Sequence, residues 1–434
     1  MTAEMRLINH LKSLNRDNLA VLRASPASEI SGALGDLGTL LPLMIALSLA
    51  HCIDLPSTLV FTGLFNVVTG MVFGIPLPVQ PMKAIAAAVL SYSAQRTLPT
   101  TTTAGFFVSL TLLFLSTTNL LSLFTRYIPL QVIKGIQLGA GVRLAVTGTA
   151  SLGPLRNADS LIVVGIPSFL FLLFTSRSPR FPTALYLFLA GVVLALLSTD
   201  MWEWPAIEIW KPKIRVDPTG LFDYFTFQES WGDAAAMAVA QLPLTVLNSV
   251  VAVSALAGGL YPDNQEKVPT VKSLGLSVGV MNVIGAWFGV MPVCHGSGGL
   301  AGQWRFGARS GASVMILGLM KMVLGVFFGN SLLGILEKFP RGVLGVMVLA
   351  AGLELAKAGL MGVTLTAETG RKEKEEWVVV MMTVLGLMGF RNDAAGFVMG
   401  MVTWGCYRGL DKLERRRERR VVVGDDGERR PLLR

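Results

Sequence analysis

Long apolar segments follow one another along almost the whole of this 434-residue chain. A helix needs about twenty predominantly apolar residues to cross the hydrocarbon core of a bilayer. Between residues 30 and 408 the sequence holds about twelve such segments and two shorter ones, near 77–93 and 292–305, that glycine and proline interrupt. Only 15% of the residues are charged, against roughly one quarter in soluble domains. The chain is therefore predicted to be an all-α polytopic membrane protein with about fourteen transmembrane segments.

The positive charge of the chain lies at the ends of these segments. The formal net charge is +9, and its densest cluster is "DKLERRRERR" (Asp411 to Arg420). Basic residues beside spans favour the cytosolic side and attract anionic lipid headgroups, which explains the excess without a nucleic-acid partner. We expect membrane lipid as a partner, no nucleic acid, and both termini in the cytosol. Residues 1–28 hold no cleavable signal pattern and form a cytosolic N-terminal segment.

Two stretches of the chain repeat one another. "IPLQVIKGIQLGAGV" (128–142) and "FPRGVLGVMVLAAGL" (339–353) share proline, valine, leucine and glycine at positions 211 residues apart. The same offset carries Pro81 onto Pro292, so the two interrupted segments correspond. A unit of this length holds about seven spans, and an odd number makes the second copy enter the membrane from the opposite side. We expect a seven-plus-seven inverted repeat, with copies at 29–199 and 231–408 and a loop at 200–230.

The interrupted segments predict two half-helices. Pro76, Pro78 and Pro81 lack a backbone donor and disfavour helix before themselves, so the chain should be extended over 74–80 and helical from about Pro81. In the second copy a helix should begin within "HGSGGLAGQW" (295–304). Irregular backbone at membrane depth is tolerated only when it is buried in protein or lines a cavity. Two helix N-termini meeting there would form an internal anion site.

Several polar side chains lie near these breaks. Lys83 falls in the first helical turn, where a cation opposes the helix dipole unless an anion compensates; the alternative is that it snorkels to the interface. Asp36 lies inside a span and is a functional candidate, or else an ion-pair partner or helix cap. Gln241 and Asn248 lie in the first span of the second copy and can donate to an anion. His295 is either a ligand or proton carrier, or a structural histidine.

Other charged and reactive residues are given no transport role. Arg143 and Lys321 lie close to span ends and are interpreted as interface or packing charges. The three cysteines lack the spacing of a metal site or disulfide framework. Ser297 with His295 would suggest a hydrolase, but no third orienting acid has an evident position. We therefore expect a protein that is not an enzyme and has no metal or cofactor.

Four stretches resemble a known family. "GALGDLGTLLP" (32–42), "PLPVQPMKAIAA" (76–87), "QLPLTVLNSVVAV" (241–253) and "GVMPVCHGSGGLAGQWRFGARSG" (289–311) are similar to signature segments of the molybdate transporter family within the sulfate permease superfamily. The resemblance covers roughly residues 28–408. It implies a fourteen-span protein of core and gate domains that moves molybdate by an elevator-like shift of the core. The charged cytosolic tail, 409–434, is too short for the soluble C-terminal domain of many sulfate permeases.

The resemblance also implies a substrate site. Its members are Gln80, Lys83, His295, Gly296 and Ser297 in the interrupted segments, with Asp36, Gln241 and Asn248 from the flanking spans. Importing a dianion against an inside-negative potential costs about 2.3 kcal/mol per charge per 100 mV, so a coupled proton is expected, with Asp36 or His295 as its carrier. Sulfate is the alternative substrate and an anion channel the alternative mode of transport. A homodimer is left open.

The tail carries one targeting pattern. Glu428 stands before Leu432 and Leu433 in the spacing of an acidic dileucine signal. This favours the vacuolar membrane, with the plasma membrane as the alternative.

Overall fold

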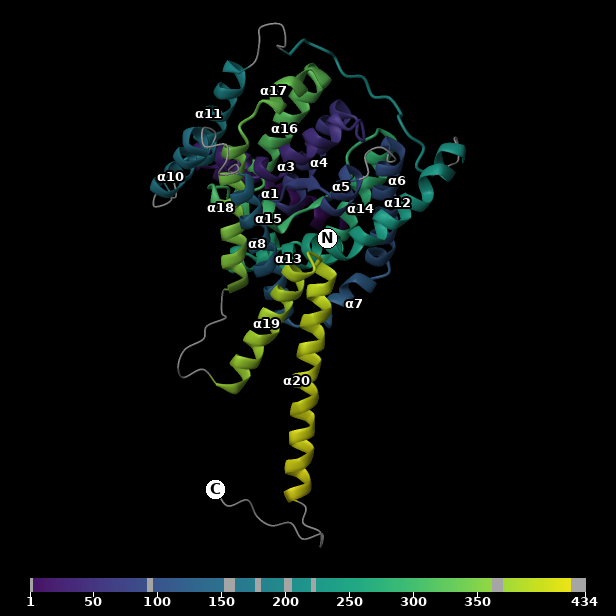
Figure 1. The fold of residues 1–434 in the computed structure, drawn as a ribbon, viewed down its shortest axis with the longest axis vertical. Coiled ribbons are helices and arrows are strands. Elements are labelled where there is room, and N and C mark those ends of the chain that lie inside the picture. The colour runs from purple at the N-terminus through teal and green to yellow at the C-terminus, as the bar shows by residue number, and fades with distance from the viewer. Residues whose placement is uncertain are drawn as a thin grey trace.

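The computed structural model of the protein describes residues 3–91, 97–151, 161–175, 181–198, 205–219, 224–360 and 370–422. These residues are almost entirely helical (Figure 1). An N-terminal helix, α1 (Ala3–Ala24), precedes two series of elements, one for each copy of the repeat. The first series comprises α2 (Pro26–Leu34), α3 (Leu37–Leu49), α4 (Leu55–Phe73), β1 (Val79–Pro81), α5 (Lys83–Ser91), α6 (Leu98–Thr117), α7 (Leu120–Arg126), α8 (Leu130–Ser151), η1 (Leu161–Gly165), α10 (Ile166–Thr175) and α11 (Thr183–Leu197).

The second series repeats this order. It comprises α12 (Tyr224–Leu244), η3 (Thr245–Val251), α13 (Ala252–Leu260), η4 (Gln265–Lys267), α14 (Val271–Trp287), β2 (Val293–His295), α15 (Ser297–Arg305), α16 (Ala312–Phe327), η5 (Gly329–Leu332), α17 (Leu333–Glu337), α18 (Arg341–Leu360), α19 (Arg371–Gly389) and α20 (Asp393–Val422). The predicted all-α inverted repeat with two half-helices, α5 and α15, is confirmed. The two short strands before the half-helices are an addition that the sequence did not predict.

Six helical stretches of the described chain are long and apolar enough to cross a membrane. They are Pro26–Leu49, Leu55–Phe73, Leu98–Thr117, Trp231–Leu260, Gln265–Trp287 and Arg341–Leu360. A seventh would be α16 with the following Gly329–Glu337, but the pair is bent by 114°. Several other helices also present large apolar side chains on the outside, such as Phe174 and Leu197, which are 80% and 78% exposed. Apolar side chains on the surface of such a bundle suit a lipid environment.

The two copies pack against each other at glycines. A Cβ atom on Gly141 of α8 would lie 2.8 Å from the Gly352 carbonyl oxygen of α18, and a Cβ on Gly352 would lie 2.7 Å from the Gly141 carbonyl oxygen. Gly148 and Gly345 face each other reciprocally in the same way. Small residues let membrane helices approach closely, which increases their dispersion contacts. This reciprocity is what a two-fold axis between the repeats produces, and its glycines include the pair that the 211-residue offset aligned.

A second glycine crossing joins α4 to α16. Gly63 meets Gly318 there, and Gly70 meets Gly311. The helices therefore form two bundles. We call α2–α6 with α12–α16 the core bundle, and α8, α10 and α11 with α18–α20 the gate bundle.

An asparagine on the preceding helix anchors each short strand. Asn66 Oδ1 of α4 accepts a hydrogen bond from Val79 N at 2.7 Å, and Asn282 Oδ1 of α14 accepts one from Val293 N at 2.7 Å. Asn282 Nδ2 also donates to Val293 O at 2.6 Å. Because buried backbone groups in a membrane need a protein partner, these asparagines stabilise the break in each span.

The anchor predicts a stability effect. Replacing Asn282 by alanine leaves the N–H and C=O of Val293 unpaired, at about 1–3 kcal/mol each. We expect Asn282→Ala to lower the free energy of unfolding by about 2–4 kcal/mol, measured as a lower thermal unfolding midpoint in detergent. Asn264→Ala, on an exposed loop, is the control. Equal midpoints for both variants would contradict the anchoring role.

The repeat register differs between the two parts of each copy. Gly141 and Gly352 are 211 residues apart, but Val79 and Val293 are 214 apart, as are Lys83 and Ser297. The alignment of Pro81 with Pro292 is therefore wrong by three residues, and Pro78 is the structural counterpart of Pro292. The offset is still 214 between the starts of α6 (Leu98) and α16 (Ala312). It is 211 between the starts of α8 (Leu130) and α18 (Arg341), so the first copy carries three extra residues between α6 and α8 and a single offset could not align both parts.

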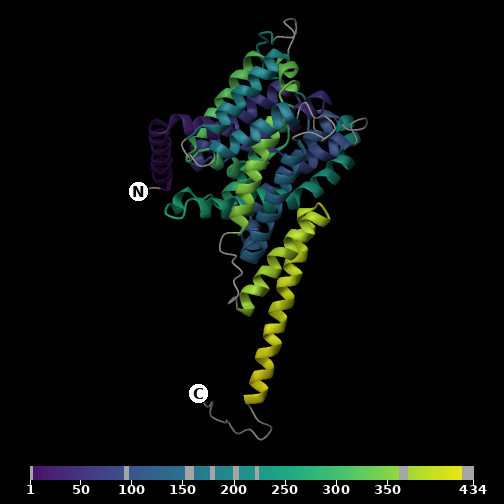
Figure 2. The ribbon, with the colours of Figure 1, turned by 60° about the vertical axis from the view of Figure 1, so that its left-hand side comes forward.

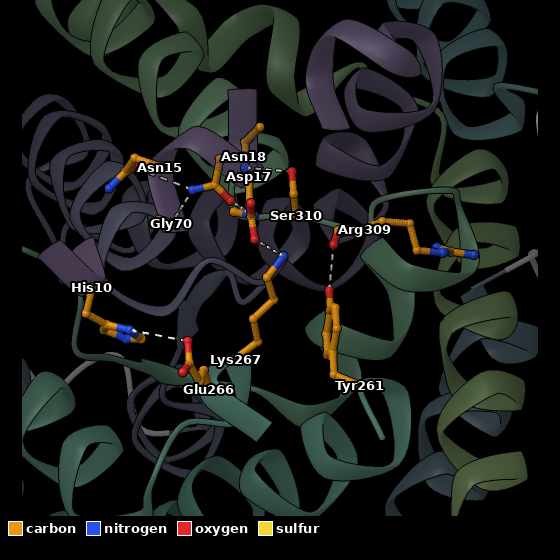
Figure 3. Close-up of polar contacts among 12 residues, drawn as sticks. His10, Asn15, Asp17, Asn18, Gly70, Tyr261, Glu266, Lys267, Arg309 and Ser310 are labelled. Carbon is orange, nitrogen blue, oxygen red and sulfur yellow. Dashed lines mark hydrogen bonds and ion pairs between the residues drawn. The ribbon is translucent and has the colours of Figure 1, made fainter. Parts of the chain in front are cut away.

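Helix α1 docks on the core bundle through polar contacts (Figure 3). Asn18 Nδ2 donates to Gly70 O at 3.0 Å, and Asn18 Oδ1 accepts from Gly311 N at 2.8 Å, so one side chain bridges the glycine crossing of α4 and α16. Lys267 Nζ lies 3.5 Å from Asp17 Oδ2. The 1–28 segment, predicted only as polar and basic, is thus largely a helix fixed to the core.

Two loops pack on the core bundle, one on the side where α1 docks and the other on the opposite side. Tyr261 Oη donates to Arg309 O at 2.8 Å, and burial raises the pKa of the Tyr261 hydroxyl, which keeps it protonated as a donor. On the other side, the extended chain at 205–217 pairs with helix ends: Trp210 N donates to Val326 O at 2.8 Å, and Arg215 lies 3.3 Å from Asp54. Residues 205–217 of the loop predicted at 200–230 therefore pack against the core, and α12 begins inside the predicted loop at Tyr224.

The last two helices project from the rest of the protein as a hairpin (Figures 1 and 2). Arg371 donates to both carboxylate oxygens of Glu414 at 3.0 Å, which fixes α19 against α20. Helix α20 continues to Val422, so the boundary predicted between 408 and 409 falls inside a helix. The dileucine pattern at Leu432 and Leu433 lies outside the described residues.

Candidate functional site

The two strands cross at the centre of the core bundle and bring the half-helices together. β1 and β2 are antiparallel, and the register places Gln80 opposite Cys294 and Val79 opposite His295. Met82 N donates to Pro292 O at 2.8 Å just beyond the pairing. The predicted helix starts are close to those observed, Lys83 for α5 and Ser297 for α15. A single residue therefore separates each strand from the half-helix that follows it, and the N-termini of the two half-helices flank the crossing.

Asp36 forms a buried polar network with Thr39 and Gln80. It occupies the N-cap position of α3, in the break between α2 and α3, where its side chain makes no capping hydrogen bond, and it is 1% exposed. Thr39 Oγ1 donates to Asp36 Oδ1 at 2.5 Å, and Gln80 Nε2 donates to Thr39 Oγ1 at 2.8 Å and also to Asp36 Oδ1. Asp36 Oδ2 has no hydrogen-bond partner among the described residues. The carboxylate thus has one satisfied oxygen and one that is available to a proton or ligand.

The glycines of α15 serve two different purposes. A Cβ on Gly296 would lie 1.6 Å from Gln80 Oε1, and one on Gly299 would lie 2.6 Å from Gln80 Nε2. Both positions are glycine because the Gln80 side chain fills the space. A Cβ on Gly298 would meet only the Leu144 side chain among the described residues, at 2.9 Å. The N-terminus of α15 therefore packs against Gln80 at Gly296 and Gly299, and faces α8 at Gly298.

The N-terminus of α5 is capped by a side chain from the second repeat. Gln241 Oε1 of α12 accepts hydrogen bonds from Ala84 N at 2.8 Å and Ile85 N at 3.3 Å. Gln241 Nε2 donates to Thr245 Oγ1 at 2.8 Å, which orients the amide. Lys83, in the same turn, is half-buried and interacts electrostatically with Asp36. The side-chain oxygen of Gln241 thus accepts the hydrogen bonds of the first amides of α5, and Lys83 supplies the positive charge at this helix end.

Asn248 connects the first span of the second copy to α15. It lies in the π-helical segment η3, a distortion that is frequent at functional sites. Asn248 Oδ1 accepts a hydrogen bond from Ser297 Oγ at 2.5 Å. Asn248 is half-buried whereas Ser297 is fully buried. The asparagine amide is therefore oriented beside the N-terminus of α15.

His295 lies on the other face of the strand pair. Successive residues of a strand point to opposite faces. His295 Nε2 lies 2.9 Å from Ser277 Oγ of α14, and its ring packs edge-on against Phe73 of α4. The structure therefore brings together Asp36, Gln80, Lys83, Gln241, Asn248 and Ser297 with Gly296, but it does not place the His295 side chain with them.

Two residues near this network were not predicted as part of it. Cys294 faces the same side as Gln80 and interacts with Ser249 and Lys83; strand alternation would have indicated it had the strand been predicted. Lys321 of α16 is 3% exposed and interacts electrostatically with Asp36. Of the two interpretations that the sequence left open, an interface charge or a packing charge, the first does not hold, because the Lys321 side chain is buried inside the protein. The hydropathy of α16 did not indicate that Lys321 would be buried.

The arrangement can bind a small anion in the interior of the membrane. Lys83 provides charge, while the α15 amides and the Asn248 amide provide hydrogen-bond donors. Within the described ranges, no three histidine, cysteine or acidic side chains gather in a way that could hold a metal ion. The charge of Lys83 and these hydrogen-bond donors suit the recognition of an anion.

The chain is similar to known transport proteins. The profile of a family described as "Molybdate transporter of MFS superfamily" matches residues 28–144 and 233–355. Molybdate transporter 2 of Arabidopsis thaliana is 37% identical over 427 residues, covering 87% of this chain and 86% of that protein. Molybdate transporter 1 of Arabidopsis thaliana is 38% identical, covering 87% of each chain, and Molybdate transporter 1 of Chlamydomonas reinhardtii is 29% identical, covering 86% of this chain and 90% of that protein.

Solved structures share the fold at low sequence identity. The transmembrane domain of the cyanobacterium bicarbonate transporter BicA aligns with a TM-score of 0.50 and 17% identity, covering 86% of this chain and 97% of that chain. SLC26A9 aligns with a TM-score of 0.56 and 15% identity, covering 88% of this chain and 66% of that chain. These neighbours have the seven-plus-seven inverted repeat, so the architecture is theirs although the family description refers to the MFS superfamily. The chain belongs to the molybdate transporter family, a family of transport proteins rather than enzymes.

Proposed function

We propose that this protein is a secondary active transporter of molybdate and that the dianion binds between Lys83 and the N-terminus of α15. The observation that carries the proposal is the meeting of two half-helices beside Lys83 and the Asp36–Gln80 network, in a chain of the molybdate transporter family. Molybdate is tetrahedral and doubly negative, and lysine, amide and backbone donors suit its four oxygens. The names of the relatives support molybdate as the substrate.

Coupling to protons follows from the charges beside the site. Asp36 interacts with two lysines, Lys83 and Lys321, so in their ionised forms the three groups carry a net charge of +1. A bound dianion makes this −1, and a proton on Asp36 makes it neutral. A low-dielectric interior disfavours net charge, so dianion binding and protonation of Asp36 should favour each other. We infer that Asp36 carries a coupled proton.

An elevator-like movement is supported by where the site residues are attached. Asp36, Gln80, Lys83, Gln241 and Ser297 all belong to the core bundle, on α3, β1, α5, α12 and α15. These residues therefore keep their positions relative to one another when the core bundle moves, while α8 and α18 of the gate bundle stay in place. Basic residues at the α1 side and along α20 support a cytosolic location for both termini.

Transport by the purified full-length chain in proteoliposomes tests the proposal. We expect uptake of labelled molybdate that increases when the outside is made acidic relative to the inside, because protons then drive inward symport. A fifty-fold excess of sulfate, about 2.3 kcal/mol of mass-action advantage, should leave most of the uptake intact. Uptake abolished by sulfate would indicate a general sulfate permease. A current that follows the anion gradient alone and ignores the proton gradient would indicate a channel.

A further inference from the structure

A buried ion pair in the gate bundle lies beside the proposed anion site. Arg143 Nη1 of α8 is 2.8 Å from Oδ1 of Asp393, the first residue of α20. The Asp393 side chain is 1% exposed and that of Arg143 is 32% exposed. The tip of the α19–α20 hairpin therefore places a buried carboxylate against Arg143, which the sequence interpreted as an interface or packing charge.

The ion pair is close to the start of both half-helices. Leu144, the residue after Arg143, is the neighbour that a Cβ on Gly298 would meet, at 2.9 Å. Lys83 interacts electrostatically with Arg143 and also with Asp393. Arg143 and Lys83 thus lie on opposite sides of the boundary between the gate and core bundles, and both side chains are partly exposed.

Asp393 satisfies Arg143 only partly. Apart from this ion pair, neither oxygen of Asp393 receives a hydrogen bond from the described residues. A buried carboxylate loses several kcal/mol of hydration, and this loss is recovered only when further hydrogen bonds complete the pair. A guanidinium has five N–H donors and binds planar or tetrahedral oxyanions through two at once. A tetrahedral dianion can therefore satisfy Arg143 better than one carboxylate oxygen does.

We propose that Arg143 is a substrate-binding residue supplied by the gate bundle, and that Asp393 serves as its counter-ion only while the site is empty. This inference rests on the proposed oxyanion function of the site. The incoming dianion binds between Lys83 and Arg143 and displaces Asp393. Loaded substrate then connects core and gate, and the tip of the α19–α20 hairpin is released from α8.

A double-mutant cycle on the full-length protein tests this. The variants are Arg143→Gln, Asp393→Asn and their combination. For each variant, the molybdate concentration that gives half-maximal effect is measured in two assays, uptake and thermal stabilisation. We expect a value about ten-fold higher for Arg143→Gln, which loses a charged contact, and about three-fold lower for Asp393→Asn, which loses the competitor. Asparagine is also favoured at helix starts, so α20 should be retained.

The combined variant separates binding from structure. If Arg143 binds substrate, Arg143→Gln with Asp393→Asn keeps the high half-saturating concentration of Arg143→Gln. If the pair is only structural, both single variants lose thermal stability and the double variant recovers wild-type behaviour, which would overturn the proposal. Arg371→Gln is the matched control, because it removes an exposed arginine that joins α19 to α20 far from the site. Its half-saturating concentration should be unchanged.

The readout also distinguishes this inference from the proposed function. The stabilisation assay uses molybdate and sulfate in parallel. If sulfate alone stabilises the wild type, the molybdate assignment fails, and the same cycle measured with sulfate decides the role of Arg143. If molybdate binds and Arg143→Gln behaves as wild type, the inference fails and the function stands. A wild type that neither anion stabilises would overturn both.

Discussion

Lys83→Ala is expected to reduce molybdate uptake more than the loss of any other single charge that solvent can reach. Lys83 is half-buried at the start of α5, and the neighbouring amides of Ala84 and Ile85 already bond to Gln241 Oε1. The substrate therefore cannot replace the lost charge with those amides. A hydrogen bond to a charged group contributes about 1.5–3 kcal/mol, so the half-saturating concentration should rise about ten- to one-hundred-fold.

The control for this prediction is Lys357→Ala. Lys357 is 69% exposed and pairs with Glu354 on the surface of α18, so its removal should change neither protein abundance nor uptake. The measurement is initial uptake in proteoliposomes over a range of molybdate concentrations, normalised to reconstituted protein. Wild-type saturation by the Lys83 variant would show that the α15 terminus holds the anion alone.

Asp36→Asn is expected to abolish the response of uptake to the proton gradient. Asparagine is nearly isosteric and can still accept from Thr39 and Gln80, but it does not exchange a proton at physiological pH. Wild-type uptake should increase as the external pH falls below the internal pH. Uptake by the variant should not change with external pH, and its rate should be about one tenth of the wild-type rate or lower. The measurement is molybdate uptake at fixed internal pH and stepped external pH.

Removing the Asp36 charge also affects stability, and a second variant separates the two effects. Lys321 is buried and its Nζ has no hydrogen-bond partner among the described residues, so loss of Asp36 leaves an uncompensated cation, at a cost of about 3–5 kcal/mol. Asp36→Asn with Lys321→Met should recover abundance but not proton coupling. Asp263→Asn, on an exposed loop, is the matched acidic control. Proton-driven uptake by Asp36→Asn would exclude this residue as the carrier.

The fold was largely predictable because its strongest constraints are local. The apolar segments follow from the thickness of the bilayer, and the breaks follow from Pro76, Pro78 and Pro81, which cannot continue a helix. The repeat was visible because Gly141 and Gly352 face each other across the two-fold axis, where nothing larger than glycine fits. Pro81 was misaligned with Pro292 because an insertion between the two parts of a repeat does not change the hydropathy pattern of either part.

The sequence by itself determined that this chain spans a membrane, repeats in inverted order and breaks two spans to form half-helices, because hydropathy and proline act within a few residues. Only the tertiary structure decided which polar groups share the site. It placed Cys294 with Gln80 and turned His295 toward Ser277, because strand pairing sets the face of each side chain. It buried Lys321 and paired Arg143 with Asp393, 250 residues further along, because helix packing brings together charges whose separation in the chain carries no signal.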